Sequence, residues 1–481
     1  MIIIQTVLLS TILGVPNHPS GLLFPEYDFT PPSSVTYRYE LSSGLPVYIA
    51  EDKELPLVDI TFTFRGGSYL DPADMVGLSG MMASLVRDGG TTSLSAEELD
   101  ERFEFLAASA GVGGSGETIS ASLNTLSSNL DESFPLFVDM LRNPGFQQSR
   151  FNLGKDGVLE NLKQRNDQPS VILRREANSL MFGDSYRGRQ TTGEMIDLLT
   201  IEDLKAIHGE IINPSNLIIS VSGDFNRDEM LRTLEEQVGD WVFGNKVADP
   251  PEVDSNYEPG VYFVDQDVSQ GGVRIGLRSL RLGDSDLEAA TVMNYILGGG
   301  GFSSRITQTV RSDEGLAYSA GSQLIPGVYM DGFWGAGYES KSKTVALSAD
   351  LIFKEIGKIK TKLVSSDDLM LAKGALVEQF PSFFQSKAQT VSLFVSDEIS
   401  GRDPNYWSTY KDRINAVRAE DVMRVANDLL ETNKMAMVVV GDWDVISSGN
   451  DRATMNDVIE IIGGSIVELP LRDPLTLQPI E

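Results

Sequence analysis

The sequence predicts an α+β protein that contains two copies of one unit, each about half of the chain. At 481 residues the chain is too long for one ordinary hydrophobic core. The predicted strand Thr118–Leu123 and the helix after it have a parallel in the strand Gly332–Tyr338 and its following helix. Two predicted strands also end in the same pair of residues, Gly223-Asp224 and Gly441-Asp442. Two separate closing strands argue against the alternative, one large mixed sheet.

The first unit opens with a hairpin, predicted by alternating polar and apolar residues around Ser42-Ser43-Gly44. Short β-rich runs and longer amphipathic runs follow it. The predicted strands are the Tyr37–Ala50 hairpin, Leu57–Phe64, Thr118–Leu123 and Leu217–Gly223, and the predicted helices are Gly77–Val86, Ala96–Ala110, Leu126–Met140, Phe151–Gln164, Gln168–Phe182 and Leu204–Ile211, the last helix of this half.

The second unit repeats this order after the polar, proline-rich segment Asn245–Pro259. Its predicted strands are Gly260–Asp265, Gly271–Leu277, Leu316–Leu324, Gly332–Tyr338 and Met435–Asp442, and its predicted helices include Leu287–Leu297, Ile306–Asp313 and Lys341–Ile359, the last with Ser340 as N-cap. We therefore expect a leader at 1–24, a first domain at 25–245, a linker at 246–259 and a second domain at 260–481.

The composition is that of a globular protein, and it excludes several classes of function. The chain has 69 acidic and 39 basic residues, a net charge of -30, so nucleic acid is not an expected partner. Such a surface would attract a cationic peptide, although solubility is the commoner reason for acidity. The absence of cysteine excludes thiol catalysis and disulfides. The two histidines, His18 and His208, form no pair at metal-ligand spacing, and His208 is predicted on a surface helix.

The apolar run Ile2–Val15 has the length of a signal-peptide core and is too short to span a bilayer. It lacks both a preceding Lys or Arg and an A-x-A cleavage site. We expect an export signal here, and hence a periplasmic or otherwise exported protein. The alternatives are a buried N-terminal strand and a cytoplasmic location. Nothing later in the sequence is long and apolar enough for a transmembrane helix.

The stretch Leu297–Tyr318 predicts a candidate site. Four glycines, Gly298, Gly299, Gly300 and Gly301, predict a mobile loop that approaches another backbone closely. A short helix follows, with Gly315 as its C-terminal stop, and a strand begins next to it. This corner could point Arg311 and Tyr318 the same way, as a site that holds an oxyanion requires. The alternative is structural: a helix-end charge and a half-buried strand residue.

Other motifs in the sequence give weaker evidence of function. Gly111–Gly116 fits G-x-G-x-x-G, but it follows a predicted helix and precedes a strand, whereas phosphate needs the N-terminus of a following helix. We interpret it as a flexible loop. The acidic pairs Asp71/Asp74 and Glu97/Glu98 lack a recognisable partner and are interpreted as loop and helix-start charges.

The duplicated unit, the Leu297–Tyr318 stretch and the Gly-Asp strand ends together resemble the pitrilysin/insulinase family of zinc metallopeptidases. The similarity is closest to the half-length branch that includes mitochondrial processing peptidase. It runs from about Tyr37 to Asp442 and beyond. The motif R-x-x-x-G-L-[AS]-Y after a glycine-rich loop is a hallmark there, and Arg311 and Tyr318 match it. The resemblance implies two homologous domains, each a mostly antiparallel sheet packed with helices.

The family binds zinc through an inverted H-x-x-E-H motif, which this chain lacks. Gly80 and Ser84 stand where the ligand histidines would be, and Ala83 stands where the general-base glutamate would be. Glu160 is close to the spacing of the third ligand, but one carboxylate cannot hold zinc alone. We interpret Glu160 as a surface helix residue, and we expect no cofactor in this chain.

Members of this branch often work as pairs, in which one subunit carries H-x-x-E-H and the other carries the Arg and Tyr. The resemblance therefore implies a zinc-free subunit of a heterodimeric peptidase. Tyr318 would donate to the scissile carbonyl, Arg311 would bind a neighbouring substrate carbonyl, and Gly298–Gly301 would let the peptide backbone pass. An extended peptide would pair with an exposed strand edge. The alternative is an inactive scaffold subunit, like the core proteins of a respiratory-chain complex.

Overall fold

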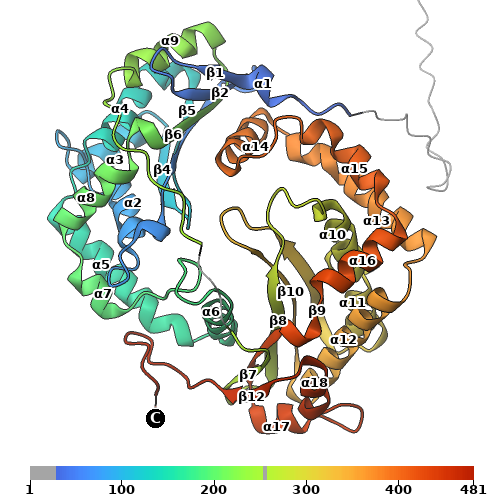
Figure 1. The fold of residues 1–481 in the computed structure, drawn as a ribbon. Coiled ribbons are helices and arrows are strands. Elements are labelled where there is room, and N and C mark those ends of the chain that lie inside the picture. Colours follow the sequence, from blue (N-terminus) through green and yellow to red (C-terminus); the bar gives the residue numbers. More distant parts are fainter. Residues whose placement is uncertain (1–28, 253–256, 481) are drawn as a thin grey trace, which may run out of the picture.

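The structure, a computed structural model, describes residues 29–252 and 257–480 (Figure 1). The predicted export signal Ile2–Val15 lies outside these residues. The described residues form two six-stranded sheets instead of one large sheet. All strands of the first sheet precede residue 245, and all strands of the second follow residue 259. None of the described helices is long and apolar enough to cross a membrane.

The two sheets have matching topologies. The order is β1-β2-β6-β3-β5-β4 in the first and β12-β7-β11-β8-β10-β9 in the second. Only the outermost strands do not correspond, because β1 comes from the start of the first half and β12 from the end of the second. Most neighbours are antiparallel, with parallel pairs at β2/β6, β7/β11 and β7/β12. The strands are β1 (Arg38–Glu40), β2 (Pro46–Glu51), β3 (Leu57–Arg65), β4 (Ser109–Gly114), β5 (Thr118–Leu126), β6 (Leu217–Gly223), β7 (Gly260–Asp265), β8 (Gln270–Ser279), β9 (Ala317–Ile325), β10 (Gly332–Lys341), β11 (Ala436–Gly441) and β12 (Ser465–Glu468).

Helices pack against both sheets, most of them on the outer faces. In the first half they are α1 (Ser34–Tyr37), α2 (Leu78–Asp88), α3 (Ala96–Phe105), α4 (Leu130–Arg142), α5 (Gln148–Lys163), α6 (Pro169–Phe182), α7 (Gly193–Leu198), α8 (Ile201–Ile211) and α9 (Arg227–Val238). In the second half they are α10 (Leu287–Asn294), α11 (Arg305–Thr307), α12 (Val345–Thr361), α13 (Ser366–Gln379), α14 (Lys387–Ser400), α15 (Tyr410–Ala416), α16 (Ala419–Leu429), α17 (Trp443–Ser448) and α18 (Met455–Ile462).

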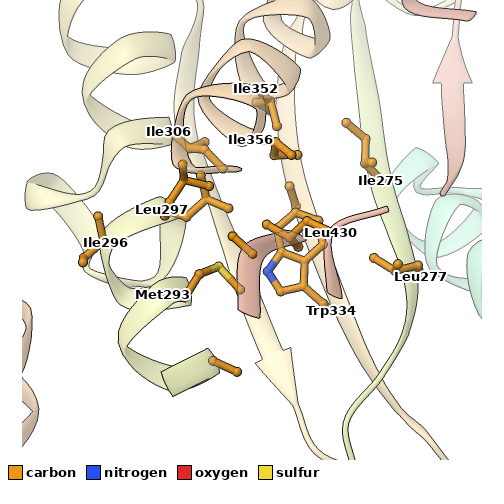
Figure 2. Packing of buried hydrophobic residues seen from close by; sticks show 14 of the residues in the cluster. Ile275, Leu277, Met293, Ile296, Leu297, Ile306, Trp334, Ile352, Ile356 and Leu430 are labelled. Atoms are coloured by element: carbon orange, nitrogen blue, oxygen red, sulfur yellow. The ribbon is translucent and has the colours of Figure 1, made fainter. Parts of the chain in front are cut away.

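Alternation along the strands separates the two faces of the second sheet. Trp334, Ala336 and Tyr338 of β10 point into the core between the sheet and α10, α12 and α16. Figure 2 shows Trp334 at the centre of this packing, with Ile275 and Leu277 on β8 to one side. The intervening residues of β8, β9 and β10 point to the opposite, inner face of the sheet.

The two halves exchange equivalent helices across the molecule. Helix α6 of the first half packs on the inner face of the second sheet against β8 and β11, and α14 of the second half packs on β2 and β6 of the first (Figure 1). Glu398 of α14 accepts hydrogen bonds from Tyr48 at 2.6 Å and from Arg38 at 3.0 Å. Arg65 donates to the carbonyl oxygens of Glu398 and Ile399. One helix of each half therefore lies against the sheet of the other half.

Several predicted elements need correction. Helix α3 ends at Phe105, and Gly111–Gly114 lie in strand β4, not in a flexible loop, because their backbone pairs with β5. Helix α9 was missed. Ser340 lies inside β10 and does not cap a helix, since α12 begins only at Val345, after a 3-10 turn.

Candidate functional site

The predicted pair Arg311 and Tyr318 meets at an exposed corner of the second half. The guanidinium carbon of Arg311 lies 4.8 Å from the ring centroid of Tyr318 and 4.5 Å from that of Phe302. Tyr318 is 86% exposed and Phe302 is 68% exposed. Within the described chain, neither the Tyr318 hydroxyl nor the Arg311 guanidinium forms a hydrogen bond or an ion pair. Both side chains therefore present free donors to the outside.

The backbone between them explains this approach. Gly315 has a φ of +65°, which a residue with a side chain rarely adopts, and it ends the helix as predicted. Its N–H donates to the Arg311 carbonyl at 3.1 Å, and the Leu316 N–H donates to the Val310 carbonyl at 2.9 Å. The chain therefore reverses within a few residues, which brings Tyr318 back beside Arg311.

The four glycines lie next to this corner, but not in an irregular loop. Gly298 and Gly299 belong to a π turn, Tyr295–Gly299, that continues α10, and Gly301 opens a 3-10 turn. A Cβ on Gly298 would collide with the backbone nitrogen of Ser322 on β9. The predicted close approach to another backbone is confirmed, and it is the reason why this position needs glycine.

Buried polar groups hold the turn in place. The Asn294 side-chain oxygen accepts hydrogen bonds from Ser322 Oγ at 2.7 Å and from Trp334 Nε1 at 3.0 Å. Thr307 Oγ1 donates to the Ala320 carbonyl at 2.7 Å and accepts from Ser304 Oγ. The glycine turn and the short helix are thus tied to the same strand that carries Tyr318.

Tyr318 lies on a sheet edge. Strand β9 ends the order of the second sheet, and its register with β10 shifts between Ala320 and Ala317. Tyr318 and Ser319 are both exposed at this bulge. A bulge at an edge re-aims side chains and leaves backbone groups available to an added strand.

The slot of the missing zinc motif offers no metal ligand. On α2, Ala83 is buried, whereas Gly80 and Ser84 are exposed, and Ser84 Oγ donates to Asp88 at 3.3 Å. Helix α5 packs beside α2 and carries the exposed Glu160, which pairs with Lys163 at 3.3 Å. Hydrogen bonds from that lysine and from Gln164 lower the pKa of Glu160. This donor set does not fit zinc.

The described residues also contain no group of three His, Cys, Asp or Glu side chains that could hold a metal ion. Asp71 accepts hydrogen bonds from the Gly77 and Ser79 N–H groups, both at 2.9 Å, and so serves the start of α2 as predicted. His208 is half-buried on α8, and the exposed Lys205 and Gly209 show that this helix lies at the surface, as predicted. The Nε2 of His208 lies 2.8 Å from the Leu141 carbonyl, and burial lowers its pKa.

Two adjoining cavities lie along the inner face of the second sheet. One, of about 390 Å³, is lined by Gly298, Gly299, Gly301 and strands β8, β9 and β10. The other, of about 700 Å³, lies between the halves and is lined by α6, β8, β9 and the turn Ser115–Glu117. They share Arg274, Gln323 and Phe333. A groove therefore leads from the glycine turn to the contact between the halves.

Comparisons with known proteins agree with this geometry. The description "Insulinase (Peptidase family M16)" matches residues 47–194, and "Peptidase M16 inactive domain" matches residues 198–376, which include the Arg311–Tyr318 corner. Together they cover more than half of the chain. The chain belongs to the insulinase (M16) peptidase family.

Relatives within the insulinase family carry differing names. A "non-peptidase homolog" of Helicobacter pylori is 23% identical, over 85% of this chain and 95% of that protein. An "uncharacterized zinc protease" of Mycobacterium leprae is 29% identical, over 42% of this chain and 46% of its own length. The fold matches a crystal structure of a peptidase M16 inactive domain from Pseudomonas fluorescens, with a TM-score of 0.76 and 22% identity over 84% of this chain and 97% of that one.

Sequence reasoning found Arg311, Tyr318 and the glycines, but it missed Phe302 and Arg274. Phe302 directly follows the four glycines, and an aromatic residue next to a glycine run was a usable signal in the sequence. Arg274 gave none, because only the pairing of distant strands places it in the groove.

Proposed function

We propose that this chain is the non-zinc-binding subunit of a heterodimeric metallopeptidase of the insulinase family. The partner would be a homologous subunit that carries H-x-x-E-H and contributes zinc, and the substrate would be a peptide. The observation that carries the proposal is the stack of half-buried Arg311 on exposed Tyr318, whose donors are not used within the described chain. The slot on α2 supports it, because neither it nor any other group of side chains among residues 29–252 and 257–480 could hold a metal ion that activates water.

The corner would act on charge that develops during peptide cleavage. The Tyr318 hydroxyl donates to the carbonyl oxygen of the scissile bond as it becomes an oxyanion, and Arg311 binds the carbonyl of a neighbouring residue. The stack with Phe302 holds the guanidinium in one orientation, so that little order is lost on binding. The glycine turn leaves room for a peptide backbone, which adds to the free edge of β9.

Reconstitution tests the proposal. The chain alone and an H-x-x-E-H homologue alone should each show little cleavage of an unstructured peptide, and their mixture should form a heterodimer in light scattering and cleave it. Tyr318→Phe should lower turnover of the mixture by more than about tenfold, as loss of an oxyanion donor does. The matched variant Tyr39→Phe, in the first half, should leave turnover unchanged. Equal turnover of the Tyr318→Phe and wild-type mixtures would contradict the assigned role.

The alternative is a structural subunit without a role in catalysis. A chain of Complex III from Candida albicans shares the fold, with a TM-score of 0.69 and 14% identity over 85% of this chain and 96% of that one. An ion-paired Arg311 would fit that alternative, whereas the unpaired Arg311 beside exposed Tyr318 favours catalysis in trans. Copurification with a large membrane complex, together with unchanged turnover in Tyr318→Phe, would support the structural role.

A further inference from the structure

The groove has a floor that is almost bare of side chains. Strand pairing places Arg274 on β8 beside Gly337 on β10, and Gly337 beside Gly321 on β9, in one row across the sheet. The next row on the same face contains Gly276, Gly335 and Gln323. All six residues line the two cavities. A flat strip of backbone of this kind lets an extended peptide lie directly on the sheet.

Only part of this floor is open. The Phe333 ring lies where a Cβ on Gly276 or Gly335 would be, so it covers the second row. In the first row, a Cβ on Gly321 would lie 2.8 Å from the Gly298 carbonyl oxygen. A Cβ on Gly337 would meet only the Val273 carbonyl oxygen, at 3.4 Å, an ordinary contact. Gly337 therefore leaves a slot one side chain wide between Arg274 and the glycine turn.

Arg274 is a half-buried cation with no partner among the described residues: it forms no ion pair and no hydrogen bond there. Burial and the nearby Arg174 both lower its pKa, because neither favours the charged form. The other charged side chains of the larger cavity are satisfied, since Arg187 donates to Glu117 at 2.9 Å. Exposed Glu339, the next residue on this face of β10, forms no ion pair with Arg274 in the structure.

We propose that the Gly337 slot and Arg274 bind a carboxylate of an extended peptide, and so select peptides with an acidic group among the substrates of the proposed peptidase. This inference rests on the proposed function only where it calls the bound peptides substrates. Peptide binding itself can be measured on the chain alone. A guanidinium meets a carboxylate through two parallel hydrogen bonds, and partial burial strengthens them. The carboxylate supplies the hydrogen-bond acceptor that Arg274 lacks among the described residues.

The position suits a residue near the cleaved bond. Gly321, in the same row as Arg274, is three residues along β9 from Tyr318, about 10 Å in an extended strand. A peptide on this face would therefore span the slot and the Arg311–Tyr318 corner with about three residues. The net charge of -30 makes the preference unexpected, since a chain with this charge repels acidic peptides on average.

Calorimetric titration of the chain with three ten-residue peptides of Ala and Ser tests the proposal and identifies the source of the carboxylate. The first has a central Glu and blocked ends, the second has Gln in its place, and the third has Gln and a free C-terminal carboxylate. We expect the first to bind about tenfold or more tightly than the second. If only the third binds tightly, the slot recognises a chain terminus, which supports the same chemistry.

Arg274→Met should abolish the preference of the chain for the carboxylate, and its circular dichroism should be that of the wild type, because no partner within the described residues is lost. Arg232→Met, at an exposed helix position in the first half, is the matched control and should keep the preference. If Arg274→Met does not fold, binding by Gly337→Val decides the question. A Cβ at this position makes only an ordinary contact, and the valine side chain should occupy the slot and weaken binding of the carboxylate peptide at least tenfold.

Equal binding of the three peptides by wild type, or an undiminished preference in Gly337→Val, would overturn the proposal. These results are independent of the Tyr318→Phe experiment, because titration uses no partner and measures no cleavage. A carboxylate preference together with unchanged turnover in Tyr318→Phe would keep the binding site and reject the catalytic role. Equal binding of the three peptides together with a lower turnover in Tyr318→Phe would reject only the site at Arg274.

Discussion

The guanidinium of Arg311 stacks on the ring of Tyr318, although one ends a helix and the other opens a strand. A left-handed glycine, Gly315, reverses the chain between them. Phe302 closes the other side of the guanidinium, so the arginine lies between two exposed aromatic rings. Arg311 forms no ion pair among the described residues, and exposed aromatic side chains that gather at one place are typical of binding surfaces.

Phe302→Ala should lower the turnover of the reconstituted mixture about two- to fivefold, because a cation–π contact at an exposed position contributes about 0.5–1 kcal/mol to the orientation of Arg311. The melting temperature of the chain should not change, since Phe302 is 68% exposed. The matched control is Phe105→Ala, at the exposed end of α3. If the two variants have equal turnover, Phe302 does not position Arg311.

Gly298→Ala and Gly357→Ala should change the free energy of unfolding in opposite directions. A Cβ at Gly298 collides with the backbone of Ser322, which should cost about 1–3 kcal/mol. Gly357 is exposed inside helix α12 with nothing within 4 Å of its Cβ position, and alanine there should add about 0.5–1 kcal/mol. Urea denaturation measures both. A neutral Gly298→Ala would show that the glycine turn can move away from β9.

The elements that the sequence predicted correctly are those with strong local patterns. Strand β6 is an unbroken β-rich run, Leu217–Gly223, and it lies as predicted. Strand β4 was missed because its glycines disfavour a strand locally, whereas pairing of Gly111 with Ser122 and of Gly113 with Ser120 overrides that preference. Helix α9 had a usable signal, since Asn226 caps it and accepts from the N–H groups of Asp228 and Glu229.

Some residues of the candidate site could likewise be predicted from local sequence, and others could not. Arg311 and Tyr318 are close in sequence and belong to one motif, so their meeting could be predicted from a single turn. The slot at Gly337 depends on the register of three strands and could not be predicted. Arg274 on β8 and Gly321 on β9 are distant in the sequence, and no local pattern records that they share a row with Gly337.

Asn294→Leu should destabilise the second half by about 2–4 kcal/mol, because it leaves the Ser322 hydroxyl and the Trp334 indole N–H without their acceptor in a buried place. Urea denaturation of the chain measures the loss. Asn152→Ala, on the exposed face of α5, is the control and should change stability by less than about 0.5 kcal/mol. Equal effects of both substitutions would show that the glycine turn is held by other contacts.

Stability should fall as the pH is lowered below about 6.5, in part because of His208. Burial lowers the pKa of His208 below the usual histidine value of about 6.5. Between that value and the lower folded pKa, the unfolded chain binds more protons than the folded chain, so acid favours unfolding. One such group contributes at most about 1.4 kcal/mol per pH unit. Urea midpoints measured from pH 7.5 to pH 5 report the slope.

His208→Gln should flatten this slope, because an amide keeps a donor for the Leu141 carbonyl but takes up no proton in this range. Lys205 is exposed on the same helix. Lys205→Gln removes a charge but leaves His208 in place, so this variant should keep the wild-type slope. If both variants kept the wild-type slope, His208 would not be the source of the acid sensitivity. Glu398 acts at lower pH: hydrogen bonds from Arg38 and Tyr48 outweigh the effect of burial and lower its pKa, so its contribution to stability is lost only below about pH 4.5.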